Sequence, residues 1–313
     1  MDPSDLYPCR PCPGCGDDPP MPEVFRNSSP GAESLAFEEL KPHWHGFFQE
    51  KAFFSYVRCR QCGLLFCRNY FSEAQLTELY SRMPDNTAGL PARAVQKTQK
   101  GYFHVLRKYS ALQGHYLEIG PDIGLFSEYC VREGNFEHFW LFEPNRSIHA
   151  ELKEVLGGKE FTLSEEMLDY GRIADGTLST AVMIHVLDHL PDPVKVLQEI
   201  RTKLEDQGLL FLVTHDESSF LAKMTKDRWP AYCLQHPQLF SPSSLRTLLK
   251  KAGFRTLEIR KSYNHFPLLY LVKHLLWAAG LKIPVPSGNR FSIPLKLGNI
   301  ITVAMKKDSG EDE

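Results

Sequence analysis

The chain has 313 residues, with 36 Lys and Arg against 38 Asp and Glu and a formal net charge of −2. This length suits one large domain and a small module, and the 42% of hydrophobic residues can form an ordinary globular core. The near-neutral charge counts against a protein that depends on binding a polyanion, because phosphate contacts need a surplus of basic side chains.

The N-terminus has no feature of a signal peptide, because residues 1–10 are polar and contain two prolines. The most apolar stretch, 266–281, is interrupted by Lys273 and His274 and falls short of the roughly 20 residues that a membrane span needs. A cytoplasmic protein without a transmembrane segment is therefore expected.

Six of the eight cysteines precede residue 70, and four of them form two C-x-x-C-G motifs. Each motif can place two thiolates on one metal, and four thiolates suit a structural Zn²⁺ ion. The predicted ligands are Cys12, Cys15, Cys59 and Cys62. Cys9 and Cys67 remain alternative ligands. The sequence thus predicts a cysteine-rich zinc-binding module over residues 1–80.

The middle of the chain, from about 95 to 215, alternates short apolar runs with helical patterns. Strands are expected at 115–119, 139–142, 160–163, 180–184 and 209–213. Helices are expected at 125–133, at 147–156, and from Pro193 to near Gly208. Such alternation indicates a parallel sheet of βαβ units.

The C-terminal part contains one clear helix, opened by Ser241-Pro242 and ended by Gly253. Its apolar stripe is formed by Leu245, Leu248, Leu249 and Ala252. Strands are expected at 255–260 and 300–305. The polar tail, 308–313, is expected to be disordered.

A glycine loop follows the first predicted strand of the middle region, in the segment Leu117-Glu118-Ile119-Gly120-Pro121-Asp122-Ile123-Gly124. It lacks the glycine spacing of a dinucleotide fingerprint. The second strand ends at Glu143, roughly 20 residues beyond the loop, where a carboxylate can accept hydrogen bonds from ribose hydroxyls. These features together predict a nucleotide site at the carboxyl edge of the sheet.

The chain resembles the class I S-adenosylmethionine-dependent methyltransferases over residues 100–307. The resemblance rests on the glycine loop and on five further segments: His185-Val186-Leu187-Asp188-His189-Leu190-Pro191-Asp192-Pro193, Gly208 to Val213, His236 to Pro242, Lys251 to Phe254, and Gly298 to Ile301. It implies a Rossmann-like α/β fold of seven strands in the order 3-2-1-4-5-7-6 with the last strand antiparallel, over a domain at 95–307. The residues before it resemble the zinc-binding, zinc-ribbon-like region ahead of some sugar and small-molecule methyltransferases, through Tyr56-Val57-Arg58-Cys59, Gly63 to Phe66 and a helix at 72–80.

The resemblance also implies roles for individual residues. Glu118, Gly120 and Gly124 would line the methionine part of S-adenosylmethionine, Glu143 would bind its ribose, and His185 would lie beside it. Asp122 stands where the family has glycine, and either accepts a hydrogen bond from the cofactor's ammonium group or weakens the site. The cofactor-binding set is therefore Glu118, Gly120, Asp122, Gly124, Glu143 and His185.

Asp188 and His189 are the first candidates for a catalytic base, with His185 and His215 beside them. The alternative is structural, with Asp188 capping a turn and His189 bonding a loop. Trp229, Tyr232 and His236 either wall an acceptor pocket or pack against the core. The apolar stretch 266–281 is read as a cover over the acceptor or as an oligomer contact.

The predicted function is methyl transfer from S-adenosylmethionine to a small-molecule acceptor, whether a sugar, a lipid-linked compound or a secondary metabolite. Two alternatives stay open: an RNA or protein methyltransferase that recognises its target through the zinc module, and a non-catalytic scaffold that has lost cofactor binding. The charge balance disfavours a nucleic-acid partner, and the sequence leaves the oligomeric state open.

Overall fold

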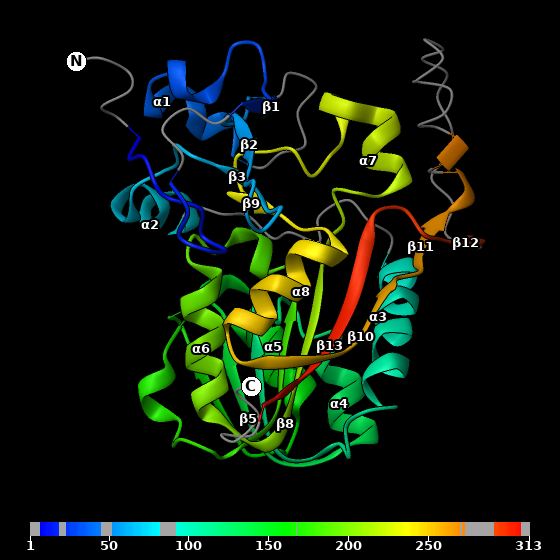
Figure 1. The fold of residues 1–313 in the computed structure, drawn as a ribbon. Coiled ribbons are helices and arrows are strands. Elements are labelled where there is room, and N and C mark those ends of the chain that lie inside the picture. The colour runs from blue at the N-terminus through cyan, green and yellow to red at the C-terminus, as the bar shows by residue number, and fades with distance from the viewer. Residues whose placement is uncertain are drawn as a thin grey trace.

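The protein is described from a computed structural model, which places residues 7–18, 23–44, 52–81, 92–166, 168–269, 271–272 and 291–307. Figure 1 shows an α/β domain with helices on both sides of its sheet and the N-terminal module seated at one end of that sheet. The predicted disordered tail and most of the apolar stretch 266–281 lie outside the described residues. Among the helices in the described ranges, none combines the length and apolarity that a bilayer crossing requires.

The main sheet has seven strands in the predicted order. From one edge to the other they are β10 (Phe254–Lys261), β13 (Asn299–Lys306), β8 (Leu204–His215), β7 (Leu178–Ile184), β4 (Gln113–Ile119), β5 (Asn135–Phe142) and β6 (Phe161–Ser164). The strands from β8 to β6 pair in parallel, whereas β13 runs antiparallel to both β8 and β10. The predicted Rossmann-like methyltransferase topology, 3-2-1-4-5-7-6 with the last strand antiparallel, is confirmed.

Alternating residues of β4 face opposite layers, as a strand covered on both sides requires. Tyr116 packs with one face, whose helices are α3 (Ala92–Leu106), α4 (Ser127–Glu133) and α5 (His149–Leu156). Leu117 and Ile119 pack with the other face, whose helices are α6 (Pro193–Lys203) and α8 (Pro242–Lys251). The parallel strands therefore end together at one edge, between two apolar layers.

The helix opened by Pro193 is shorter than predicted. It ends at Lys203, and β8 starts at Leu204, whereas the sequence pattern placed the helix end near Gly208. Leu204 is fully buried, so it satisfies the apolar spacing of the helix although its backbone is extended. Gln207 follows with a φ of 63°, at a shift in the pairing of β7 with β8. A bulge at the start of β8, rather than more helix, fills this stretch.

The predicted helix at 147–156 is split. It begins as η4 (Arg146–Ile148) and continues as α5, which ends at Gly157 as expected. The C-terminal helix matches its prediction, because the side chain of Ser241 accepts a hydrogen bond from Ser244 N and Pro242 is the first helical residue. β5 starts earlier than predicted, at Asn135, directly after α4.

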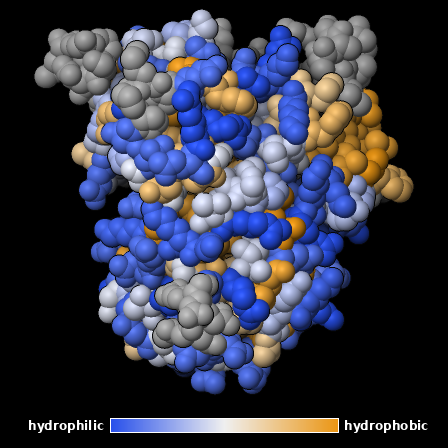
Figure 2. All heavy atoms as spheres, viewed as in Figure 1, coloured by the Kyte–Doolittle hydropathy of each residue, from blue (hydrophilic) through white to orange (hydrophobic). Residues whose placement is uncertain are grey.

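Several elements were not identified from the sequence. In the methyltransferase domain they include helix α3, the short helices α7 (Phe220–Thr225) and η7 (Lys226–Arg228), and the hairpin of β11 (Asn264–Pro267) and β12 (Ser292–Leu295). The hairpin packs on α3, where Thr98 Oγ1 accepts a hydrogen bond from His265 N at 2.8 Å. Figure 2 shows a mostly hydrophilic surface with apolar residues gathered at the right of the view, over α7 and this hairpin.

The N-terminal module is built around a second sheet, of order β1 (Val24–Arg26), β2 (Tyr56–Arg58), β3 (Leu65–Cys67) and β9 (Gln238–Leu239). Its helices are η2 (Ala32–Ser34), α1 (Phe37–Leu40), η3 (Lys41–His43) and α2 (Glu73–Ser81), the last close to the helix expected at 72–80. β9 comes from the methyltransferase part of the chain. One apolar cluster joins Trp44, Phe53 and Tyr70 to Trp229 and Tyr232, so module and domain share a core.

Candidate functional site

The loop after β4 is a tight turn that only glycine fits at two positions. Gly120 has a φ of 66° and Gly124 a φ of 79°. A Cβ on Gly120 would lie 2.6 Å from Cγ2 of Val186, and one on Gly124 would lie 2.8 Å from Cδ1 of Leu152. The closeness of Gly120 to Val186 also shows that the loop after β4 packs directly against the turn after β7.

Asp122 has the backbone shape that its position requires. Its φ is 54°, in the left-handed region that aspartate enters more readily than most residues. Its N–H donates to Oε2 of Glu143 at 3.1 Å, and the N–H of Asn145 donates to Oε1 at 2.9 Å. Glu143, at the end of β5, is thus fixed by two backbone donors, and each of its oxygens keeps a lone pair for another donor.

Two buried carboxyl groups flank this loop. Burial raises the pKa of Glu143, although its two backbone donors oppose the shift. Burial raises the pKa of Glu118, on β4, to about 7, while hydrogen bonds from Ser127 and Tyr116 favour its charged form and Glu143 disfavours it. Tyr116 and Ser127 both donate to Oε2 of Glu118. A cation beside Glu118 would favour the charged form of its carboxyl group. The resulting negative charge would in turn attract the cation.

His185 follows β7, next to the glycine loop. Its φ is 55°, its N–H donates to Val213 O at 2.8 Å, and its Nε2 lies 3.3 Å from Nδ2 of Asn299. Its Nδ1 is buried and has no hydrogen-bond partner among the described residues. Burial and the neighbouring imidazoles of His215 and His236 lower the pKa of His185 to about 3, so its ring is neutral at pH 7.

Asp188 and His215 form a hydrogen-bonded pair at the ends of two adjacent strands. Oδ2 of Asp188 lies 3.1 Å from Nδ1 of His215 and accepts the backbone N–H of His215 at 3.2 Å. Asp188 is fully buried, whereas the His215 side chain is 23% exposed. Because the carboxylate can only accept, Nδ1 carries the proton in the neutral ring and Nε2 keeps its lone pair.

His189 contacts a different residue than Asp188 does. Its ring packs against His236 with centroids 4.6 Å apart, and burial lowers its pKa well below the usual value. His236 in turn lies 4.8 Å from His215, which lies 4.9 Å from His185. The structure therefore gathers four imidazoles and one carboxylate at the carboxyl edge of β7 and β8.

The turn that carries Asp188 and His189 is held by the module's sheet. Gln238, on β9, is fully buried, and its Nε2 donates to Leu187 O at 3.0 Å and to Leu190 O at 2.7 Å. The same residue pairs with Phe66 of β3. The position of the candidate catalytic turn thus depends on a strand that completes the N-terminal module.

The four predicted zinc ligands converge on one point. The Sγ atoms of Cys12, Cys15, Cys59 and Cys62 all lie within 4.8 Å of one another. Tetrahedral zinc with bonds of about 2.3 Å needs sulfurs roughly 3.8 Å apart, so the cluster fits the ion. Both motif glycines have positive φ, and each donates its N–H to the first cysteine of its motif. The other two candidates lie elsewhere: Cys9 accepts from Arg68, and buried Cys67 contacts the carbonyls of Phe54 and His236.

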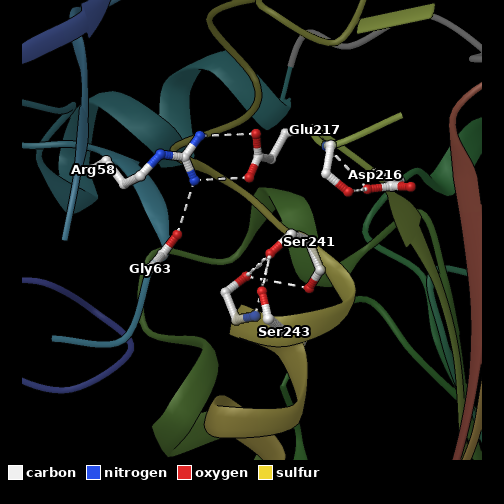
Figure 3. A network of polar contacts seen from close by, with 8 residues as sticks. Arg58, Gly63, Asp216, Glu217, Ser241 and Ser243 are labelled. Carbon is white, nitrogen blue, oxygen red and sulfur yellow. Dashed lines mark hydrogen bonds and ion pairs between the residues drawn. The ribbon is translucent and has the colours of Figure 1, made fainter. Parts of the chain in front are cut away.

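A cavity of about 500 Å³ lies between the module and the domain. It is lined by Phe25, Arg26 and Arg58 of the module, and by Glu217, Tyr232, Ser241 and Ser243 among the domain residues. Figure 3 shows its central pair, in which the guanidinium of Arg58 donates twice to Glu217, at 2.8 and 2.9 Å, and once to Gly63 O. Glu217 follows His215, the last residue of β8, by two positions.

Sequence reasoning proposed Asp188 and His215 separately but not as a pair, and it missed Gln238 and the cavity. No local pattern joins residues 27 positions apart, although both follow predicted strands of one sheet edge. Of the aromatic residues proposed as a pocket wall, Tyr232 lines the cavity, and Trp229 packs between Tyr232 and His215.

Known methyltransferases are similar to this chain. A family model described as a methyltransferase domain matches residues 88–259. An S-adenosylmethionine-dependent methyltransferase from Leishmania major is 13% identical, with 74% of this chain and 82% of that chain covered and a TM-score of 0.50. One from Thermotoga maritima is 19% identical, with 69% and 90% covered and a TM-score of 0.45. No curated protein matches the sequence.

The family match and the strand order lead to the same assignment. The match spans more than half of the chain and includes the glycine loop, Glu143 and the turn after β7. S-adenosylmethionine is the cofactor of this fold family. The chain therefore belongs to the methyltransferase domain family and is a class I S-adenosylmethionine-dependent methyltransferase.

Proposed function

We propose that the protein transfers a methyl group from S-adenosylmethionine to a small-molecule acceptor, part of which occupies the cavity between module and domain. The cavity is the observation that carries this proposal. Its volume, about 500 Å³, is in the range of small-molecule sites, and its lining includes Glu217, two positions beyond the strand that ends in His215. The net charge of −2 gives no general attraction for a nucleic-acid acceptor.

The cofactor is assigned to Glu118, Gly120, Asp122, Gly124, Glu143 and His185. These residues fit it, because Glu143 presents two fixed acceptor oxygens for ribose hydroxyls and Glu118 offers a buried negative charge to a cationic amino-acid group. The cofactor supplies the electrophilic methyl group. The chain itself supplies alignment, exclusion of water and a proton acceptor.

In this proposal His215 is the base that takes a proton from the acceptor. Its Nδ1–H is held by Asp188, which leaves Nε2 to accept, and its ring is the partly exposed member of the pair. Asp188 acts as a positioning residue through His215. His189 is retained as the second candidate base, because it belongs to the same imidazole cluster.

The four-cysteine cluster is proposed to hold one structural Zn²⁺, with all four positions filled by thiolates and none open for chemistry. We assign residues 1–80 to this zinc module and 95–307 to the methyltransferase domain. The module's role is to complete the cavity through Phe25, Arg26 and Arg58 and to hold the turn of Asp188 through β9.

Methyl incorporation tests the acceptor class. The purified protein is incubated with methyl-labelled S-adenosylmethionine and with separate cell fractions of metabolites and lipids, RNA, and protein. Label in the metabolite or lipid fraction supports the proposal, whereas label confined to RNA or protein contradicts it. Titration calorimetry with S-adenosylhomocysteine is run in parallel, and an absence of binding would remove the enzymatic function altogether.

Substitution of the paired histidine tests the base. His215→Gln should lower kcat by about 10² to 10³, because the proposed proton acceptor is lost, with unchanged affinity for S-adenosylhomocysteine. His189→Gln is the matched control and should lower kcat by less than about tenfold. The reverse ranking of the two variants would assign the base to His189 instead.

A further inference from the structure

Large apolar side chains project from one face of the domain. On α7, Phe220 is 76% exposed and Met224 is 65% exposed, one helical turn apart. On and beside the β11–β12 hairpin, Phe291 is 75% exposed, Leu268 42% and Ile293 39%. These five side chains are the apolar part of what we call the apolar–basic surface.

The two apolar groups belong to one surface. Ser219, the N-cap of α7, lies against Gly298, which follows β12, because a Cβ on Gly298 would be 3.2 Å from Ser219 Oγ. The N–H of Asp216 also donates to Gly298 O at 2.7 Å. Figure 2 shows the apolar residues of α7 and of the hairpin region gathered on one side of the molecule. Exposed apolar side chains gathered in this way mark an interaction site.

Basic side chains border this patch. Helix α3 presents Arg93, Lys97 and Lys100 on its exposed side and contains no acidic residue. Lys97 Nζ donates to Ser292 Oγ at 3.1 Å, which places this stripe beside β12. On α7 and η7, Lys223 and Lys226 are exposed next to Met224. Basic groups therefore lie on both sides of the apolar side chains.

The local charge differs from that of the whole chain. The chain carries slightly more acidic than basic residues, yet no acidic residue occurs between Glu258 and Asp308. In α7 and η7 the one acidic residue, Asp227, is paired with Arg26. Exposed aromatic and aliphatic side chains ringed by lysine and arginine are the combination that binds anionic bilayers, where apolar groups enter the interface and cations meet lipid phosphates.

We propose that the apolar–basic surface docks the protein on an anionic phospholipid bilayer. This surface borders the acceptor end of the sheet, since α7 begins five positions after His215 and the hairpin leads into β13, which pairs with His215 through Asn299. Docking would present the cavity to molecules at the membrane surface. The corollary that the acceptor is a lipid or a lipid-linked compound rests on the proposed function.

Vesicle co-sedimentation tests the docking. The full chain is mixed with vesicles of pure phosphatidylcholine and with vesicles containing about one quarter phosphatidylglycerol. We expect partition onto the anionic vesicles at least about tenfold above the neutral ones, falling as salt is raised from about 0.1 to 0.5 M. Phe220→Ser/Met224→Ser and Phe291→Ser/Ile293→Ser should each reduce partition by about tenfold or more.

Matched control variants test whether vesicle binding depends on the apolar–basic surface or on exposed apolar and basic residues anywhere on the protein. Val24→Ser/Leu168→Ser changes two exposed apolar residues outside the surface, and Lys250→Gln/Lys251→Gln removes two exposed lysines on α8. Both controls should bind vesicles like the parent, whereas Arg93→Gln/Lys100→Gln should lose about tenfold or more. Circular dichroism checks that each variant is folded.

Three results would overturn the proposal: equal binding to neutral and anionic vesicles, unchanged binding of the Phe220/Met224 variant, or conversion of a dimer to a monomer by that variant without vesicle binding. The last result would assign the surface to a second copy. Titration with S-adenosylhomocysteine on the same variants keeps the two proposals apart. Vesicle binding without cofactor binding would defeat the proposed function alone, and methyl transfer without vesicle binding would defeat the docking alone.

Discussion

The two halves of the sheet edge are built differently. On the cofactor half, the loops after β4 and β5 are shaped by their own residues, through positive φ at Gly120, Asp122 and Gly124 and backbone donors to Glu143. On the histidine half, the turn after β7 is held by Gln238 of β9, a strand of the module's sheet. In the proposed assignment, cofactor binding is therefore a local property of the chain, whereas acceptor chemistry depends on distant segments.

The contrast between the halves disappears if the module supports both of them equally. Cys59→Ser should have the largest effect, with loss of bound zinc and destabilisation on the order of 5 kcal/mol, because an incomplete thiolate set releases the ion and exposes the module's core. Elemental analysis and thermal unfolding measure it. Cys9→Ser, outside the cluster, should keep the zinc and change stability by less than about 0.5 kcal/mol. Retention of zinc by Cys59→Ser would disprove the ligand set.

The cofactor half is probed through Glu143, the proposed ribose carboxylate. Glu143→Ala should weaken S-adenosylhomocysteine binding by about 10² to 10³, because charge-assisted hydrogen bonds are lost and two backbone donors are left unpaired. Calorimetry gives the affinity. Glu137→Ala removes a carboxylate from the same strand that is 75% exposed, and it should bind like the parent. An unchanged affinity in Glu143→Ala would place the ribose elsewhere.

Gln238→Ala separates the two halves most directly. Loss of its donors leaves the carbonyls of Leu187 and Leu190 buried and unpaired, at a cost of about 2 to 3 kcal/mol. We expect kcat to fall about tenfold through the displaced Asp188, with S-adenosylhomocysteine affinity unchanged. A fall in that affinity as large as the fall in kcat would show that the halves are coupled.

The smallest predicted effect concerns pH. The pKa of Glu118 is raised to about 7 by burial, so its carboxyl group is mostly neutral at pH 6 and mostly charged at pH 8. Binding of a ligand with a cationic amino group should therefore strengthen about tenfold over this range, as the charged fraction rises. Calorimetry at several pH values checks the slope. Glu118→Gln should flatten it, and a slope that persists in this variant would assign the titration to another group.

The same contrast explains what the sequence could predict. The glycine loop, Glu143 and the four cysteines are encoded in short patterns, because each depends on spacing within about 20 residues or on repeated motifs. The strand order, by contrast, was implied by the resemblance to the class I methyltransferases. Helix α3 was missed because polar and charged residues interrupt its buried positions Ala94, Thr98 and Tyr102. The predicted end of α6 was wrong because buried Leu204 continues the helical spacing in an extended backbone.

The histidine half escaped prediction for a different reason. The pairing of Asp188 with His215, the support from Gln238 and the cavity all join segments that only the complete fold brings together. The sequence supplied the right residue types at the right strand ends. It gave no signal for which imidazole would meet the carboxylate, because that choice depends on packing between the domain and the module.

Because β9 belongs to the module's sheet, that sheet can be completed only late in synthesis. The hydroxyl of Tyr56 donates to the carbonyl of His236, a partner that the ribosome adds 180 residues later. Until then the outer edge of β3 is unpaired and the aromatic side chains beneath it lack Trp229 and Tyr232. The N-terminal segment must therefore wait, partly open, for most of the chain to emerge, and a fragment that stops before β9 should be prone to aggregate.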